Sequence, residues 1–195
     1  MRNLLIVFIK NAQLGKVKTR LAATIGDVRA LEVYNSLLDH TLFITKDLSC
    51  DKVVYYSDFI PRLDEWRSSG FFQAVQSGAD LGEKMLTAFS EGFSQHYASV
   101  VIIGSDCYEL SSEHINIAFS KLANVPFVIG PAYDGGYYLL GMTHLCKQLF
   151  MGKAWSSDSI FQSTTNDLKA LGQPFHLLET LHDIDNEADL IRSGK

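Results

Sequence analysis

Short apolar runs alternate with longer amphipathic segments along the first two thirds of the chain. The runs are rich in Val, Ile and Leu, which is typical of strands buried on both faces of a parallel sheet. In the longer segments the apolar residues recur at three- and four-residue steps, which predicts helices with one face toward the core. The pattern predicts strands at 4–9, 52–57, 71–75, 99–104, 126–130, 137–142 and 175–178, and helices at 27–45, 61–68, 80–96, 111–122, 157–171 and from 186 onward.

The alternation of strands with helices predicts βαβ units and therefore an α/β fold with a mainly parallel sheet. Segment 126–142 has the pattern of strand, turn and strand, so we expect the parallel order to be interrupted there and the sheet to be mixed. No internal repeat, low-complexity segment or linker divides the sequence. We therefore expect residues 1–195 to form one domain.

Four consecutive β-branched residues at 100–103 predict a central strand of this sheet. Gly104 ends the run, and Asp106 follows just beyond the carboxyl end of the strand. Open α/β sheets bind their ligands in the crevice outside these ends, which makes Asp106 a candidate binding residue. The alternative is that Asp106 caps the helix that follows, as aspartate often does.

A basic loop follows the first strand. Gly15 opens it, and Lys16, Lys18, Thr19 and Arg20 follow within five residues. Glycine lets backbone N–H groups approach a ligand while lysine and arginine neutralise its charge, so the loop suits a phosphate group. It is not a P-loop, because valine stands where Ser or Thr would follow the Gly-Lys pair, and GxGxxG is absent as well. The alternative is a solvated surface loop.

A glycine-rich turn lies between the two strands expected at 126–130 and 137–142. Its residues are Asp134, Gly135, Gly136 and Tyr137. Paired glycines between strands indicate first of all a tight turn. They would also let the backbone approach a ligand, with Asp134 and the tyrosine facing the cleft.

A third candidate is the acidic pair Asp183 and Asp185 near the end of the chain. On an extended segment, side chains two residues apart point to the same side, a geometry suited to sharing a hard divalent cation. The alternative is that these carboxylates cap the helix expected from residue 186.

The composition, with 47% hydrophobic and 20% charged residues, is that of an ordinary globular protein, and the net charge is −5. The first twenty residues nevertheless hold five cations and no acid. A local basic loop on an acidic chain argues against broad nucleic-acid binding and for a small anionic ligand. The three cysteines form no CxxC pair and the six histidines show no ligand spacing, so neither a disulfide framework nor a zinc site is expected.

The apolar run at 4–9 superficially resembles a signal peptide. It is too short for one, and no small-residue cleavage site follows it. No run approaches the length needed to span a membrane. We therefore expect a cytoplasmic protein.

Taken in their order, these motifs resemble those of a family of small bacterial transferases with a GT-A-like fold. The family is generally regarded as glycosyltransferases associated with radical SAM and selenodomain proteins. The resemblance runs nearly end to end and rests on residues 15–21 (GKVKTRL), 80–85 (DLGEKM), 104–107 (GSDC), 130–139 (GPAYDGGYYL), Trp155-Ser156 and 183–185 (DID). The basic loop is distantly similar to that of 2-phospholactate and molybdenum-cofactor guanylyltransferases.

The resemblance implies a three-layer α/β/α sandwich of the nucleotide-diphospho-sugar transferase type, with the nucleotide lying over the first loop. The nucleotide-binding residues would be Gly15, Lys16, Lys18, Thr19, Arg20, Gly82 and Lys84. Mg²⁺ or Mn²⁺ would be held by Asp106 together with Asp185 or Asp183. The acceptor would be faced by Asp134, Gly135, Gly136 and Tyr137, and the catalytic residues would be Asp106, Asp134 and Lys18.

Three positions depart from the pattern of this family. Tyr108 and Ala12 stand where relatives usually carry proline, which changes two loops near the expected site without removing a charged group. Gly104 leaves the Asp-x-Asp pair of many metal-dependent glycosyltransferases incomplete.

We therefore expect a metal-dependent transferase that takes a nucleotide sugar and a small-molecule acceptor. The alternative with the same fold is a nucleotidyltransferase that joins a nucleoside triphosphate to a phosphorylated acceptor, and the single Asp106 favours it. An interpretation from a different class is a nucleotide-binding protein without turnover, which the intact basic loop and acidic residues disfavour. The sequence leaves the base, the sugar, the acceptor and the oligomeric state open.

Overall fold

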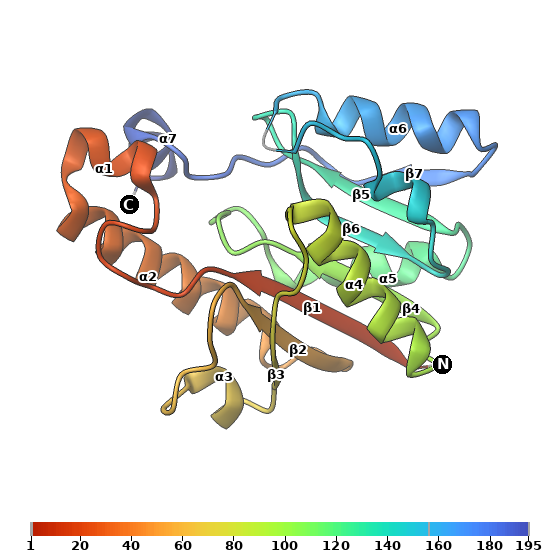
Figure 1. Cartoon of the computed structure of the whole chain (residues 1–195), viewed down its shortest axis with the longest axis horizontal. Helices are drawn as coiled ribbons and strands as arrows, with labels where there is room; N and C mark the ends of the chain where they lie inside the picture. Colours follow the sequence, from red (N-terminus) through yellow and green to blue (C-terminus); the bar gives the residue numbers. More distant parts are fainter. Residues whose placement is uncertain (1, 156, 195) are drawn as a thin grey trace.

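A computed structural model describes residues 2–155 and 157–194 of the chain. The described strands form a seven-stranded sheet in the order β3-β2-β1-β4-β6-β5-β7 (Figure 1). They are β1 (Asn3–Ile9), β2 (Asp51–Tyr56), β3 (Phe72–Val75), β4 (Ser99–Ile103), β5 (Phe127–Pro131), β6 (Tyr137–Met142) and β7 (Phe175–Leu177). All pairings are parallel except those of β6 with β4 and with β5. The prediction of a mixed sheet interrupted at 126–142 is confirmed.

Helices cover both faces of the sheet. One face packs against α2 (Asp27–Thr45), α3 (Glu65–Ser68) and α5 (Ser112–Leu122). The other packs against α4 (Leu81–Ser94), the 3₁₀ helix η1 (Lys147–Phe150) and α6 (Ile160–Ala170). At one end, α1 (Thr19–Ile25) and α7 (Glu187–Ser193) lie close together beside α2 (Figure 1). The expected three-layer α/β/α sandwich is confirmed, and none of the described helices is long and apolar enough to cross a membrane.

The first strand shows why its sequence is an unbroken apolar run. Leu5 and Val7 face the core under α2 and α5, whereas Leu4 and Ile6 face the core under α4. All four side chains are buried. Since successive side chains of a strand point to opposite faces, a strand covered on both faces needs apolar residues at every position.

Several predicted helix starts are confirmed by their caps. The carboxylate of Asp80 accepts the N–H of Glu83 at 2.9 Å and opens α4. Ser111 caps α5, and the side chain of Asn186 accepts the N–H of Asp189 and opens α7. These residues satisfy N–H groups that have no partner within the helix.

Other predicted boundaries are wrong. The helix expected at 61–68 begins only at Glu65, because the carboxylate of Asp64 accepts the N–H groups of the next turn. The helix expected at 157–171 begins at Ile160, and Ser156 before it lies outside the described residues. The basic loop ends in a helix, α1, that the sequence pattern did not predict.

Candidate functional site

A cavity of about 850 Å³ opens at the carboxyl edge of the parallel strands. Its wall is built from the ends of β1 and β4, the first turn of α4, the turn between β5 and β6, and the segment that precedes α7. This edge is where open α/β sheets bind ligands, and the volume is that of a small-molecule site.

Asp106 lies in this cavity on the loop that follows β4. It does not cap the next helix, because Ser111 holds that position in α5. The capping alternative considered for Asp106 is therefore wrong, and its carboxylate is free to face the cavity. The neighbouring Tyr108 donates a hydrogen bond to the carbonyl oxygen of Val33 at 3.4 Å, and its ring packs edge-on against that of His40. These contacts with α2 hold the loop where relatives are expected to carry proline.

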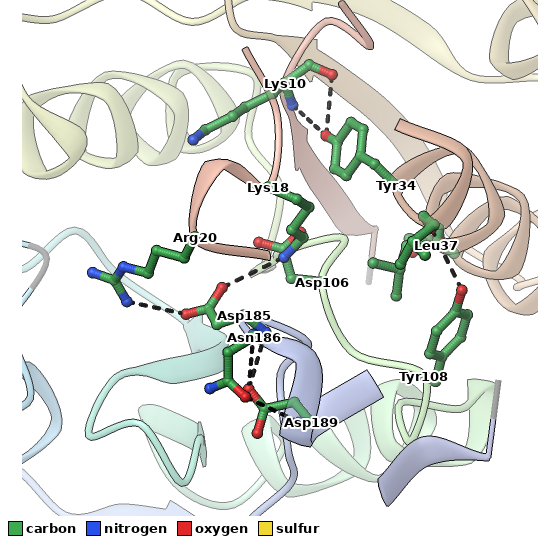
Figure 2. Close-up of polar contacts among 12 residues, drawn as sticks. Lys10, Lys18, Arg20, Tyr34, Leu37, Asp106, Tyr108, Asp185, Asn186 and Asp189 are labelled. Carbon is green, nitrogen blue, oxygen red and sulfur yellow. Dashed lines mark hydrogen bonds and ion pairs between the residues drawn. The ribbon is translucent and has the colours of Figure 1, made fainter. Parts of the chain in front are cut away.

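Lys18 is the most constrained residue of the basic loop. Its backbone is left-handed, with φ 48° and ψ 44°, and it stands at the N-cap position of α1. Its side chain is only 5% exposed, and Nζ lies 2.9 Å from Oδ1 of Asp106 and 3.5 Å from Oδ1 of Asp185 (Figure 2). The basic loop therefore places the ammonium group of Lys18 between the carboxylates of Asp106 and Asp185, two of the expected metal ligands.

Arg20 contacts the carboxylate of Asp185 from the solvent side. Its Nη1 lies 3.5 Å from Oδ2 of Asp185, and its side chain is 73% exposed (Figure 2). Thr19 and Lys84 also line the cavity. In contrast, Lys16 is exposed outside the cavity, where its N–H donates to the carbonyl oxygen of Gln13.

A backbone hydrogen bond from the N–H of Ile184 to the carbonyl oxygen of Asp106 joins the acidic segment before α7 to the loop after β4. Ile184 is buried, and Asp183 and Asp185 on either side of it both line the cavity. The pKa of Asp183 is raised to about 8, mainly by burial and also by the charges of Asp106, Asp134 and Asp185, while Lys18 acts to lower it. Four carboxylates therefore influence one another across this cavity.

The glycine-rich turn brings Asp134 to the cavity. Its Oδ1 accepts the N–H of Gly136 at 2.8 Å, which leaves Oδ2 without that bond. Gly135 has φ +88°, and a Cβ there would lie 1.9 Å from the carbonyl oxygen of Asp158, so only glycine fits. Gly136 and Tyr137 line the cavity, but Gly135 does not.

Two other glycines expected near the nucleotide do not line the cavity. Gly15 has φ +73° and shapes the loop behind it. Gly82 lies under the indole of Trp155, which does line the cavity, and a Cβ on Gly82 would be 2.3 Å from the indole Nε1. Gly82 therefore positions a wall of the cavity through this aromatic side chain.

The polar cavity residues that sequence reasoning missed include Lys10, Ser57, Gln76 and Asp158. The first three directly follow β1, β2 and β3, so their position at strand ends was a usable signal. The Nε2 of Gln76 donates to the carbonyl oxygens of Ile9 and Tyr55, each at 3.0 Å. Asp158 lies between η1 and α6 and had no comparable signal.

Two other cavity residues are held in fixed protonation states. The hydroxyl of Tyr34 donates to the carbonyl oxygen of Lys10 and accepts its N–H, and burial raises the pKa of this tyrosine (Figure 2). Burial likewise raises the pKa of Cys107 to about 12. The Cys107 thiol is therefore not a thiolate nucleophile at neutral pH.

The donor set of the cavity fits a hard divalent cation. Among the residues that the structure describes, no three His, Cys, Asp or Glu side chains are gathered closely enough to enclose a metal ion. Mg²⁺, however, is commonly held by one or two carboxylates together with substrate phosphates and water. Asp106 and Asp185, whose oxygens both face the Lys18 ammonium, supply such a pair.

Residues 41–157 match the family described as "Uncharacterized protein conserved in bacteria (DUF2064)". The structure is similar to a crystal structure described as a "putative nucleotide-diphospho-sugar transferase" from Desulfovibrio desulfuricans G20, with a TM-score of 0.90 and 30% identity over 97% of this chain and 85% of that chain. No curated protein matches the sequence.

More distant structures share the fold. CMP:2-keto-3-deoxy-manno-octonic acid synthetase complexed with CTP has a TM-score of 0.60 at 8% identity, over 99% of this chain and 97% of that chain. Rv0371c from Mycobacterium tuberculosis H37Rv in complex with manganese has a TM-score of 0.57 at 10% identity, over 98% and 97%.

Proposed function

This chain belongs to the DUF2064 family of bacterial proteins, and from that premise we propose that it is a metal-dependent transferase using a nucleotide-sugar donor. The similarity to a protein described as a "putative nucleotide-diphospho-sugar transferase" supports this class of reaction. We propose that residues 1–195 act as one domain. The association with radical SAM and selenodomain proteins stays a prediction.

One observation carries the proposal: a single cavity brings the cations of the basic loop against carboxylates from two distant segments. Lys18 and Arg20 enter from one side, and Asp106 and Asp185 from the other. A diphosphate with a divalent cation needs both kinds of group, since cations neutralise its oxygens and carboxylates hold the metal.

In the proposed reaction, an acceptor hydroxyl attacks the anomeric carbon of the sugar, and the nucleoside diphosphate leaves. A divalent cation would stabilise the charge of the departing diphosphate. The structure of Rv0371c, which shares this fold, is described with manganese and supports the choice of such a cation. Asp106 with Asp185 or Asp183 would hold that cation, and Lys18, Thr19, Arg20 and Lys84 would orient the phosphates. Asp134 would receive the acceptor proton on its second oxygen.

The charges of the cavity support sugar transfer over transfer to a phosphorylated acceptor. Its wall carries four cations (Lys10, Lys18, Arg20, Lys84) and five carboxylates (Asp106, Asp134, Asp158, Asp183, Asp185). Asp134 and Asp158 have no ion-pair partner among the described residues. Gly135, beside Asp134, packs against the backbone of Asp158, so two of these carboxylates come from adjoining loops. An acceptor phosphate placed there would be repelled, whereas an uncharged hydroxyl would not.

Nucleotidyl transfer is the second candidate, and a specific observation favours it. A structure with this fold, CMP:2-keto-3-deoxy-manno-octonic acid synthetase, is described with CTP bound. In nucleotidyl transfer, an oxygen of the acceptor would attack the α-phosphorus of the nucleoside triphosphate, and pyrophosphate would leave. Gly104, which replaces the first carboxylate of an Asp-x-Asp pair, is compatible with this chemistry.

Thermal unfolding across a ligand panel tests the proposal. The full chain is heated with nucleotide sugars and nucleoside triphosphates of each base, with and without Mg²⁺ or Mn²⁺. A ligand at a hundred times its Kd that binds only the native state adds about 2.7 kcal/mol to the free energy of unfolding. We expect a metal-dependent rise in Tm with a nucleotide sugar. A rise with triphosphates alone would favour nucleotidyl transfer, and no rise with any ligand would favour the protein without turnover.

A further inference from the structure

We infer that the Lys18 ammonium occupies the cation position between Asp106 and Asp185 in the free protein, and that a divalent cation binds there only by displacing it. This inference rests on the proposed function, because it concerns the metal that the proposed reaction uses. It makes Lys18 a positioning residue with two alternative partners, the carboxylates and the substrate phosphates.

The contacts of Lys18 are those of a fixed internal counter-ion. Its Nζ lies 2.9 Å from Oδ1 of Asp106 and 3.5 Å from Oδ1 of Asp185, and Figure 2 shows the ammonium between the two carboxylates. The Lys18 side chain is 5% exposed, whereas the carboxylates of Asp106 and Asp185 are 45% and 33% exposed and face the cavity. The buried ammonium therefore depends on these two partners, while the carboxylates stay accessible to a cation that enters the cavity.

The backbone of Lys18 indicates that these contacts are held against a local preference. Among the described residues other than glycine, only Lys18 and His96 have a positive φ. The left-handed conformation is unfavourable for a residue with a Cβ, and it persists where surrounding contacts impose it. Lys18 is also the N-cap of α1, so it lies at the junction between the basic loop and this helix.

Electrostatic repulsion predicts the order in which phosphate and metal bind. The ammonium and a divalent cation would compete for the same two carboxylate oxygens and repel each other if both were present. Metal alone should therefore bind weakly. A phosphate in the cavity offers the ammonium a new anionic partner, since Lys18 itself lines the cavity, and the carboxylates are then released to the metal. Metal and nucleotide should consequently enhance each other's binding.

The test is titration calorimetry with Mn²⁺ alone, without nucleotide, on the full-length wild-type protein and its variants. We expect Lys18→Met to bind Mn²⁺ about tenfold more tightly than the wild type, within the range usual for coupled sites. Lys18→Gln, which can still donate a hydrogen bond to Asp106, repeats the test if the Met variant does not fold. Lys18→Arg keeps the positive charge and should keep the weak affinity of the wild type.

Lys84→Met is the matched control. Lys84 lines the same cavity but has no ion-pair partner among the described residues, so its removal changes the net charge without vacating a cation position. Its Mn²⁺ affinity should rise less than threefold, roughly the limit of a screened long-range effect. An equal gain in Lys84→Met and Lys18→Met would overturn the inference, as would unchanged or absent Mn²⁺ binding in Lys18→Met and Lys18→Gln.

The result of the Mn²⁺ titration can be distinguished from the result of the thermal-unfolding test of the proposed function. If nucleotides do not stabilise the protein but Lys18→Met gains Mn²⁺ affinity, the transferase proposal fails and the assignment of Lys18 stands. If nucleotides bind with metal but Lys18→Met and Lys18→Gln bind Mn²⁺ no more tightly than the wild type, the transferase proposal stands and Lys18 is a phosphate ligand only.

Discussion

The backbone N–H of Ile184 donates a hydrogen bond to the carbonyl oxygen of Asp106 at 2.8 Å. This bond joins the loop after β4 to the acidic segment before α7, although the two are far apart in the sequence. Because it uses only main-chain atoms, and because Ile184 is buried, it aligns Asp106 with Asp185 independently of their side chains. The carboxylates of the site can therefore be changed one at a time while the segments that carry them stay in place.

Asp106→Asn should remove most of the activity and leave the fold intact. The amide keeps the size of the side chain and the bond to Ile184, but it removes a negative charge that would hold the metal. Loss of a group that stabilises charge in the transition state typically costs about 100- to 1000-fold in rate. Consumption of the nucleotide sugar found by the thermal panel gives the rate, and circular dichroism gives the stability.

Asp39→Asn is the control for this variant. Asp39 is an exposed carboxylate on α2, outside the cavity, and its amide should keep the wild-type rate. If Asp106→Asn were as active as Asp39→Asn, or if it lost stability while keeping its metal dependence, Asp106 would be a structural residue.

Arg20→Met should weaken nucleotide binding about tenfold and reduce the dependence of that binding on salt, because an exposed cation at the cavity rim is screened by ions. Lys16→Met offers a matched comparison within the same loop. Lys16 is exposed and lies outside the cavity, so its loss should change affinity less than threefold, as expected for a screened charge at a distance. Titrations of both variants at low and high salt decide the point, and identical behaviour of the two would show that only the net charge of the loop matters.

Most of the fold could be predicted from the sequence because its determinants are local and repeated. Both-face burial makes β1 and β4 apolar at every position after the first, and the glycine-rich turn marks the reversal before β6. The missed helix α1 had no such signal. It begins with Thr19 inside the basic loop, and its N-cap Lys18 is held by carboxylates that come from residues 106 and 185.

The candidate site was predictable in part for a similar reason. Residues that directly follow strands, such as Asp106, could be placed at the ligand edge from topology alone. The sequence did not distinguish Gly82 from a glycine that contacts a ligand. Gly82 is glycine because the indole of Trp155 leaves no room for a Cβ, and Trp155 lies seventy-three positions away in the sequence. Contacts between residues that are far apart in the sequence cannot be predicted from a local sequence pattern.

Gly82→Ala should therefore destabilise the cavity wall rather than strengthen α4. In a helix interior, alanine is usually favoured over glycine by about 1 kcal/mol. Here the added Cβ would lie 2.3 Å from Nε1 of Trp155, so the indole must move. We expect a red shift of Trp155 fluorescence, measured in a Trp66→Phe background that leaves it as the only tryptophan of the sequence.

Gly104→Ala is the comparison for this substitution. A Cβ on Gly104 would meet nothing within 4 Å, so the emission of Trp155 should not change. A blue shift or no shift in Gly82→Ala would show that the indole tolerates the extra methyl group where it stands.

The contribution of Asp183 to the stability of the free protein should become less favourable as the pH rises from about 4 to about 8. Its pKa is raised to about 8 by burial and by the neighbouring carboxylates, whereas an aspartate in the unfolded chain has a pKa near 3.9. Between these values the native state binds a proton that the unfolded state has lost, so the free energy of unfolding decreases with rising pH. The penalty is fully present above about pH 8 and absent below about pH 4.

Asp183→Asn removes this titration, since the amide is neutral throughout. We expect its Tm to exceed that of the wild type by a few degrees at pH 8.5, because about 1 kcal/mol moves the Tm of a protein of this size by about 2–4 °C, and to approach the wild-type value at pH 4.5. Scanning calorimetry with EDTA and no ligand gives both values. Asp39→Asn, at an exposed position, should show no such pH-dependent gain. If the two variants follow the same pH profile, Asp183 is ionised in the native state, and its charge is already balanced by Lys18.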